Sequence, residues 1–340
     1  MHEDDRVRAL RAWLTTALPA APAGSGLTLS SASADASFRR YFRAIRGAGT
    51  WIAMDAPPPR EDCRPFVQVA ALLRAAGLNA PQVLAQDLEQ GFLLLTDLGT
   101  RTYLDALKEA DAAAADALFH DALAALVVWQ RATREGVLPE YNAALLEREL
   151  ALFPEWYIGR HLGITLTGAE REALAAVEAR LVANALAQPR VFVHRDYMPR
   201  NLMVCTPNPG VLDFQDAVLG PLTYDVVSLF RDAFLSWEEA RVIDWTVRYW
   251  ENAKRQGLPV PDDFGTFYRD FEWMGLQRHL KVLGIFARLN YRDGKSAYLA
   301  DTPRFIGYAR AVAQRYHELA PLARLLDRLE ARVPATGYTF

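Results

Sequence analysis

The amino-acid sequence predicts an α+β protein with two lobes, a small one built on an antiparallel β-sheet and a larger one that is mainly helical. Three features predict this class. Short β-type runs recur before residue 97, Ala-rich helical patterns dominate from residue 101 onward, and two polar clusters flanked by β-type runs interrupt the helical part. We therefore expect residues 1–96 to form the first lobe and residues 97–340 the second.

Apolar periodicity and turn residues predict the elements of the first lobe. Val7, Leu10 and Leu14 recur at helical spacing before Pro19, and a second helical pattern closes at Gly77. The elements expected are helices at residues 3–18 and 62–76 and strands at residues 27–29, 40–45, 50–54, 82–85 and 92–96.

The second lobe should be a helical assembly. Leucine and aromatic residues at helical spacing in this part are most simply core residues. Pro154 lies inside one pattern and should kink that helix. Helical patterns cover residues 111–133, 143–161, 168–187, 238–255, 262–289, 297–317 and 320–332, and a further helix begins at Tyr224.

Composition limits the classes of function. The 340 residues are 51% hydrophobic, which is enough for a sizeable core. A net charge of −3 and an isoelectric point near 6.1, without basic runs, exclude a strong pull toward nucleic acid and favour a small-molecule partner. Cys63 and Cys205 form no disulfide or metal pattern. Without a signal sequence or a long apolar run, we expect a cytoplasmic monomer that binds no membrane.

The two polar clusters carry the chemistry. Asp196 and Asn201 lie five positions apart in the first cluster, and Asp213 begins the second. Transfer of a phosphoryl group needs a base that aims the acceptor hydroxyl, together with hard oxygen ligands for Mg²⁺. Asp196 suits the first role, and Asn201 and Asp213 suit the second. We expect His194 to support the loop by hydrogen bonding and to take no part in proton transfer.

The pattern His-x-Asp-x-x-x-x-Asn, followed by Leu-Asp-Phe at residues 212–214, resembles the aminoglycoside phosphotransferase and choline kinase family. The resemblance covers nearly the whole chain. It implies a protein-kinase-like fold and an ATP-dependent, Mg²⁺-requiring hydroxyl kinase with Asp196 as its catalytic residue. It also implies that Asp225 is the structural acid that braces the catalytic loop.

Three further segments, at residues 38–41, 54–58 and 273–279, resemble the branch of this family that serves bacterial peptidoglycan recycling. That resemblance implies an amino-sugar substrate, with transfer to the anomeric C1 hydroxyl of N-acetylmuramate and N-acetylglucosamine. Muramate carries a carboxylate, for which an arginine is a suited partner. The expected substrate residues are Gln215, Asp216, Arg278 and His279, with Arg278 as the candidate for that carboxylate.

The nucleotide is expected beneath the first hairpin and beside the connection between the lobes. Ser37 and Phe38 are the expected contacts at a hairpin tip that is small but lacks glycine. Adenine recognition in this fold uses backbone groups, so position matters more than side-chain identity. The expected segment is Leu95, Thr96, Asp97 and Leu98.

The family's phosphate-binding lysine is missing. Its position is Met54, and no lysine lies nearby. Either Arg40 or Arg43 supplies the positive charge, or the metal and backbone act alone; the alternative is that both arginines are solvated strand residues. The following helix carries no acid beyond Glu61 and Asp62, so we expect the usual lysine–glutamate pair to be absent.

Two other functions remain open. An aminoglycoside kinase would need a pocket rich in carboxylates for its polycationic substrate, whereas the C-terminal helices mix charges of both signs. A nucleotide-binding pseudokinase would explain the missing lysine and glycines, but the presence of Asp196, Asn201 and Asp213 argues against it. Measured turnover with a panel of substrates distinguishes these functions.

Overall fold

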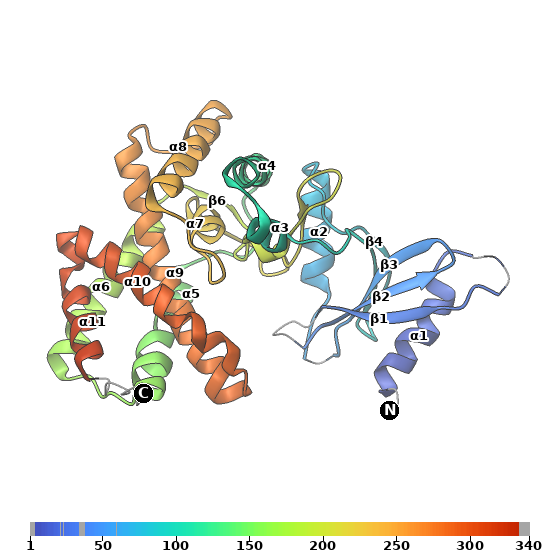
Figure 1. Ribbon diagram of the computed structural model, residues 1–340, viewed down its shortest axis with the longest axis horizontal. Helices are drawn as coiled ribbons and strands as arrows, with labels where there is room; N and C mark the ends of the chain where they lie inside the picture. The colour runs from blue at the N-terminus through green and yellow to red at the C-terminus, as the bar shows by residue number, and fades with distance from the viewer. Residues whose placement is uncertain (1–3, 21, 23, 34–37, 59, 333–340) are drawn as a thin grey trace. The chain divides into compact units, whose positions relative to one another are not determined.

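The computed structural model describes residues 4–20, 22, 24–33, 38–58 and 60–332. The chain divides into two compact units (Figure 1). Unit 1 comprises Met1–Ala132 and Pro199–Ala217, and unit 2 comprises Thr133–Met198 and Val218–Phe340. The predicted α+β class is confirmed, because unit 1 holds a five-stranded antiparallel sheet and unit 2 is mainly helical.

Unit 1 is organised around the sheet, whose strand order β1-β2-β3-β5-β4 places β3 in the centre. Both helices and all five strands predicted for this part of the chain are present within a few residues of the expected bounds. The elements are α1 (Asp5–Ala17), β1 (Thr28–Ser33), β2 (Arg40–Arg46), β3 (Gly49–Asp55), α2 (Arg64–Ala75), β4 (Val83–Asp87), β5 (Phe92–Thr96), α3 (Tyr103–Glu109), α4 (Ala112–Arg131), β7 (Leu202–Met203) and β8 (Gly210–Val211).

Helix α1 packs on the sheet through its apolar stripe. The Asp4 side chain accepts a hydrogen bond from the Arg6 backbone N–H and caps the helix. Leu10 and Leu14 are fully buried in one cluster with Leu94 of β5. Because burial of a leucine side chain contributes about 1.5–3 kcal/mol, these residues hold α1 on the sheet.

The turn between β4 and β5 requires glycine. Gly91 has a φ of +75°, and a Cβ at this position would lie 1.9 Å from the carbonyl oxygen of Ala56. The backbone N–H of Ala56 in turn donates a 2.8 Å hydrogen bond to the Gly91 carbonyl. This close approach fixes the start of the connector that runs from β3 to α2.

Unit 1 extends past the predicted lobe boundary. Thr102 pairs with Met203, the Val204 N–H donates to the Arg101 carbonyl at 2.9 Å, and the Asn208 amide donates to the Tyr103 hydroxyl at 2.8 Å. These contacts anchor the β7–β8 hairpin on α3. Residue 96 is therefore the end of β5, while the compact unit continues through α3 and α4 and includes the hairpin.

Unit 2 is built around α9 (Phe264–Asp293), a helix with buried residues along most of its length. Other elements pack on it closely: a Cβ at Gly284 would lie 2.4 Å from the backbone of Leu152. The remaining helices and strands are α5 (Ala143–Leu150), α6 (Gly168–Ala187), β6 (Arg190–Val193), β9 (Val218–Pro221), α7 (Tyr224–Phe230), α8 (Glu239–Arg255), α10 (Thr302–Arg315) and α11 (Ala320–Arg332).

Pro154 interrupts a helix, as predicted. The α-helix α5 ends at Leu150, and the chain continues as the π-helical segment Phe153–His161, with the proline in its first turn. A proline is tolerated there because the first N–H groups of a helix have no partner within it. The predicted single helix over residues 143–161 is therefore two segments.

Helix α4 has the length and apolar composition of a membrane span, the one helix among the described residues that does. Phe119, Leu126 and Trp129 of this helix are nevertheless buried inside the protein. Core helices of globular proteins have the same composition, so these properties are weak evidence for a span.

Candidate active site

The loop that carries the predicted base, Asp196, follows β6, which pairs with β9 in an antiparallel ladder. The fully buried carboxylate of Asp225 accepts the backbone N–H groups of His194 at 2.7 Å and Arg195 at 3.0 Å. The Asp196 N–H donates to Nδ1 of His194 at 3.3 Å. The predictions that Asp225 braces this loop and that His194 supports it by hydrogen bonding are both confirmed.

Asp225 is electrostatically linked to Asp196, the predicted base. Burial raises the pKa of Asp225 to about 7, and the charge of Asp196 adds to this shift, whereas the two backbone hydrogen bonds and Arg278 oppose it. The loop is thus held by a carboxyl group whose protonation depends on its neighbours.

Arg195 adopts an unusual backbone conformation, with a φ of +77°. Its guanidinium binds Glu149 at 2.6 Å, and Lys281 contacts the same carboxylate at 2.9 Å. Burial would raise the pKa of Glu149, but Lys281 and Arg195 outweigh it and lower the value. Two cations and the Tyr141 hydroxyl therefore hold a buried carboxylate that fixes the strained loop residue. No sequence pattern indicated this network.

The two predicted metal ligands lie together in unit 1. Asn201 precedes β7, Asp213 follows β8, and the Asn201 amide donates to the Asp213 carboxylate at 3.2 Å. The Gln215 amide donates to the other carboxylate oxygen at 2.9 Å, while its own buried Oε1 has no hydrogen-bond partner in the described structure. Three oxygen-bearing side chains thus converge at the end of the hairpin.

Asp213 also has a positive φ, of 60°. Together with Arg195 it is one of the two non-glycine residues with positive φ in the described chain. Such residues are uncommon and cluster at functional sites, where surrounding contacts hold them. The unusual backbone therefore falls on the two loops that the sequence singled out.

The arginines proposed for phosphate binding are engaged elsewhere. Arg40 binds the buried carboxylate of Asp55, with its Nε 3.0 Å from Oδ2, and Asp55 lies directly opposite on β3. Arg43 makes two hydrogen bonds to Asp97, at 2.6 and 3.0 Å, and a third to the Gly99 carbonyl. The interpretation of both as solvated strand residues does not match these pairs.

Arg39 makes a different contact. Its Nε lies 3.3 Å from a carboxylate oxygen of Glu61, and the two side chains are only 13% and 16% exposed. The other Glu61 oxygen accepts the Phe38 N–H at 3.1 Å. An arginine–glutamate pair is therefore present just before β2, whereas the expectation from the sequence concerned only the usual lysine–glutamate pair and its absence. No sequence pattern indicated it, because Arg39 lies in the loop before β2 and Glu61 in the connector before α2.

The remaining nucleotide candidates lie at two places in unit 1. Phe38 is 57% exposed and packs under the Arg60 guanidinium at 4.8 Å, while Ser37 lies outside the described residues. At the end of β5, Leu95 is buried and the Thr96 hydroxyl accepts the Gln82 N–H at 2.9 Å. Asp97 and Leu98 follow and are half-buried.

The predicted substrate residues are divided between the units. Gln215 and the exposed Asp216 belong to unit 1, whereas Arg278 and His279 are buried on α9 in unit 2. Arg278 is only 4% exposed, so it is no solvated face residue.

Its neighbours on unit 2 define the environment of Arg278. The guanidinium lies 6.0 Å from the Tyr224 ring centroid and interacts with the carboxylates of Asp225 and Asp232. His279 packs between Phe305 and Tyr308, and burial lowers its pKa well below the ordinary value, so its imidazole is neutral. Its packing is that of a core residue.

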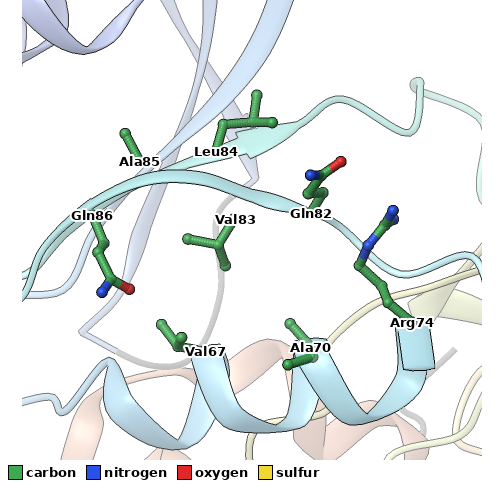
Figure 2. A pocket seen from close by; sticks show the side chains of 9 residues that line it. Val67, Ala70, Arg74, Gln82, Val83, Leu84, Ala85 and Gln86 are labelled. Atoms are coloured by element: carbon green, nitrogen blue, oxygen red, sulfur yellow. The ribbon is translucent and has the colours of Figure 1, made fainter. Parts of the chain in front are cut away.

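A pocket of about 480 Å³ in unit 1 lies apart from these residues. Val67 and Ala70 of α2 face Val83 of β4 across it, and Arg74 and Gln82 stand at one end (Figure 2). None of the predicted site residues lines this pocket, so it carries no part of the proposed chemistry.

Comparison with known proteins identifies the family. The model of the phosphotransferase enzyme family matches residues 28–264. The N-acetylmuramate/N-acetylglucosamine kinase of Pseudomonas putida is 56% identical over 91% of this chain and 90% of its own length. The protein of the same name from Neisseria meningitidis is 50% identical over 97% of this chain and 98% of its own.

Solved structures show the same fold at low sequence identity. A choline kinase from Streptococcus pneumoniae superposes with a TM-score of 0.65 and 12% identity, covering 91% of this chain and 100% of its own. The ternary complex of APH(2")-IIa with streptomycin and ATP gives a TM-score of 0.59 and 14% identity, covering 89% and 97%.

Proposed function

The chain belongs to the phosphotransferase enzyme family, and from this premise we propose that it is an ATP-dependent kinase of amino sugars. It transfers phosphate to the anomeric C1 hydroxyl of N-acetylmuramate and N-acetylglucosamine, a reaction that serves peptidoglycan recycling. The observation that carries the proposal is the 50–56% identity, over nearly the whole chain, to proteins named for these two sugars. Use of ATP implies a cytoplasmic enzyme, and we expect a monomer.

Asp196 is the proposed base. Its carboxylate would accept the proton of the C1 hydroxyl as that oxygen attacks the γ-phosphorus, and would orient the hydroxyl beforehand. The loop that carries Asp196 is held at both sides, by Asp225 through two backbone N–H groups and by Glu149 through Arg195. Positioning of this kind reduces the motion needed to reach the reactive geometry.

Asn201 and Asp213 are the proposed holders of Mg²⁺. An amide and a carboxylate 3.2 Å apart, with the unpartnered Oε1 of Gln215 beside them, form a hard oxygen donor set that suits this ion. Among the described residues no three His, Cys, Asp or Glu side chains gather as a metal site, which fits an ion that keeps most of its waters. When bound, Mg²⁺ would neutralise the charge of the nucleotide phosphates.

Arg278 is the proposed partner of the lactyl carboxylate of muramate. Its Nε is buried and has no hydrogen-bond partner in the described part of unit 2. A buried donor without a partner costs free energy that an incoming carboxylate would recover.

A substrate panel with ATP tests the proposed function. We expect phosphorylation of N-acetylmuramate and N-acetylglucosamine, loss of the reducing end in the products, and a phosphorus NMR signal of a sugar 1-phosphate. Streptomycin and choline serve as the comparison substrates. Turnover of an aminoglycoside and neither amino sugar would favour the aminoglycoside kinase, and ATP binding without turnover of any substrate would favour the pseudokinase.

A further inference from the structure

The family's phosphate-binding lysine is missing, so another group must supply positive charge near the nucleotide phosphates. Met54, at the lysine position, is completely buried and offers no cation. A nucleoside triphosphate carries several negative charges, and the carboxylate of Asp213, the proposed metal ligand, adds one more negative charge. A fixed positive charge near the phosphates is therefore expected in a kinase site.

Arg40 and Arg43 do not fit this need. Each guanidinium makes paired hydrogen bonds to a carboxylate, Arg40 to Asp55 and Arg43 to Asp97. Asp55 is fully buried and is bound by both Arg40 and Arg6, whose Nε lies 3.0 Å from Oδ1, so withdrawing Arg40 would break a buried network of ion pairs, which is destabilising. Binding of phosphate by either arginine would break an existing pair.

Arg39 lies where such a cation is needed. It is in electrostatic contact with Asp213, the proposed metal ligand, and with Asp216, which lies three positions after Asp213 in the same loop. The Nε of Arg39 lies 3.3 Å from a carboxylate oxygen of Glu61, which belongs to the connector that leads into α2. All these residues belong to unit 1, so the juxtaposition is internal to one compact unit.

The side chain of Arg39 keeps its positive charge. Burial by itself would lower the pKa of this guanidinium, but four neighbouring groups raise it above the ordinary value: those of Tyr41, Glu61, Asp213 and Asp216. Guanidinium also binds phosphate through parallel N–H groups, which suits it to replace an ammonium in this role.

We propose that Arg39 binds the nucleotide phosphates in place of the missing lysine, and that Glu61 is its positioning residue. The cation comes from the loop just before β2 and the acid from the connector before α2. The pair is therefore built from different elements than the usual lysine of the third strand and glutamate of the helix. This inference rests on the proposed function, because it assumes that the ligand is a nucleotide.

Calorimetric titration of the full-length protein with ATP and with adenosine tests the inference. Arg39→Met should weaken ATP binding roughly ten- to hundredfold, the effect of losing one charge-assisted contact, and leave adenosine binding unchanged. Arg39→Lys should recover part of the loss. Arg64→Met is the matched control, since Arg64 is 78% exposed and pairs only with nearby Asp62 among the described contacts.

Glu61→Gln tests the positioning role. It should raise the KM for ATP by less than Arg39→Met does, and the double variant should be no worse than Arg39→Met alone, because Glu61 acts through Arg39. Strictly additive effects would overturn the positioning role.

The outcomes separate this inference from the proposed function. Unchanged ATP affinity in a folded Arg39→Met protein, or equal losses for ATP and adenosine, would overturn the inference while sugar phosphorylation by the wild type could still stand. If the wild type binds ATP but phosphorylates no sugar, the proposed function fails, and the titrations still decide the role of Arg39. A melting temperature for each variant excludes loss of fold, and Arg39→Lys decides the matter if Arg39→Met is unstable.

Discussion

Asp196 is the residue on which the proposed chemistry depends most directly. We expect Asp196→Asn to keep its fold and its affinity for ATP, because Asp225 and Glu149 hold the loop through other residues and asparagine has nearly the same shape as aspartate. Turnover should fall about 10²- to 10⁴-fold, the contribution of a positioned general base. Steady-state kinetics with N-acetylglucosamine measure the loss.

The matched control is Asp244→Asn, which makes the same chemical change at an exposed aspartate of α8 that pairs with Arg248. Its kcat should equal that of the wild type. A near-normal kcat for Asp196→Asn would remove Asp196 from the role of base.

The sequence predicted individual site residues where those residues lie close together along the chain. Asp196, Asn201 and Asp213 lie within one short stretch, so their pattern was visible without knowledge of the fold. Arg39 and Glu61 are 22 positions apart, and each lies in a connecting segment, Arg39 just before β2 and Glu61 before α2. Their pairing depends on where these two segments meet in the fold, and no local spacing reports this.

Among the elements, α6 carries a half-buried acid that should make stability depend on pH. Glu178 lines a groove of about 390 Å³ between α5 and α6, and burial raises its pKa from 4.5 to about 7. The folded state thus holds this proton more tightly than the unfolded state does. Its stabilising effect is complete below pH 4.5 and is lost as the pH rises through 7.

Glu178→Gln should therefore stabilise the protein at pH 8 by about 1–3 kcal/mol and have little effect at pH 4. Urea unfolding at several pH values measures this difference. Glu172→Gln, an exposed position on the same helix, is the control and should follow the wild type at each pH. Equal stabilisation by Glu178→Gln at pH 4 and pH 8 would mean that packing, not ionisation, is the cause.

Helix α9 gives the prediction that distinguishes the two sugars. Arg278→Met keeps most of the side-chain volume and removes the charge, so kcat/KM for N-acetylmuramate should fall roughly ten- to hundredfold. The value for N-acetylglucosamine, which has no lactyl carboxylate, should barely change. Competitive assays with both sugars measure the ratio of the two kcat/KM values.

Arg269→Met is the control for Arg278, because Arg269 lies on the same helix, is 44% exposed and pairs with Glu318. Arg269→Met should leave kcat/KM unchanged for both sugars. Equal losses for both sugars in Arg278→Met would show that the arginine supports Asp225 and Asp232, or the part of the substrate that both sugars share.

Element boundaries show the limit of periodicity. The strands and most helices followed from apolar spacing and turn residues, but residues 297–317 comprise a 3₁₀ segment, Ser296–Asp301, followed by α10. A 3₁₀ turn leading into an α-helix has nearly the same apolar spacing over a few residues. Sequence patterns therefore located the helices better than they defined their ends.

The whole molecule differs from the sequence-based prediction in how the chain is divided. Residues 97–132 and 199–217 cluster with the sheet, so unit 1 contains Asn201, Asp213 and Arg39, whereas Asp196 belongs to unit 2. Contacts such as Thr102 with Met203 join segments about 100 positions apart, and no local pattern reports them. The proposed metal and phosphate ligands thus share one unit, and the proposed base lies in the other.

This division predicts how ligands stabilise the protein. Because both Asp213 and Arg39 are in unit 1, ATP alone should raise the melting temperature through Arg39, and Mg²⁺ should raise it further through Asp213. Each tenfold gain in affinity contributes about 1.4 kcal/mol, or roughly a few degrees. Asp213→Ala should keep the increase with ATP and EDTA but lose the further increase with Mg²⁺. An undiminished effect of Mg²⁺ on the Asp213→Ala protein would require another metal ligand, with Gln215 as the first alternative because its buried Oε1 lacks a partner in the described structure.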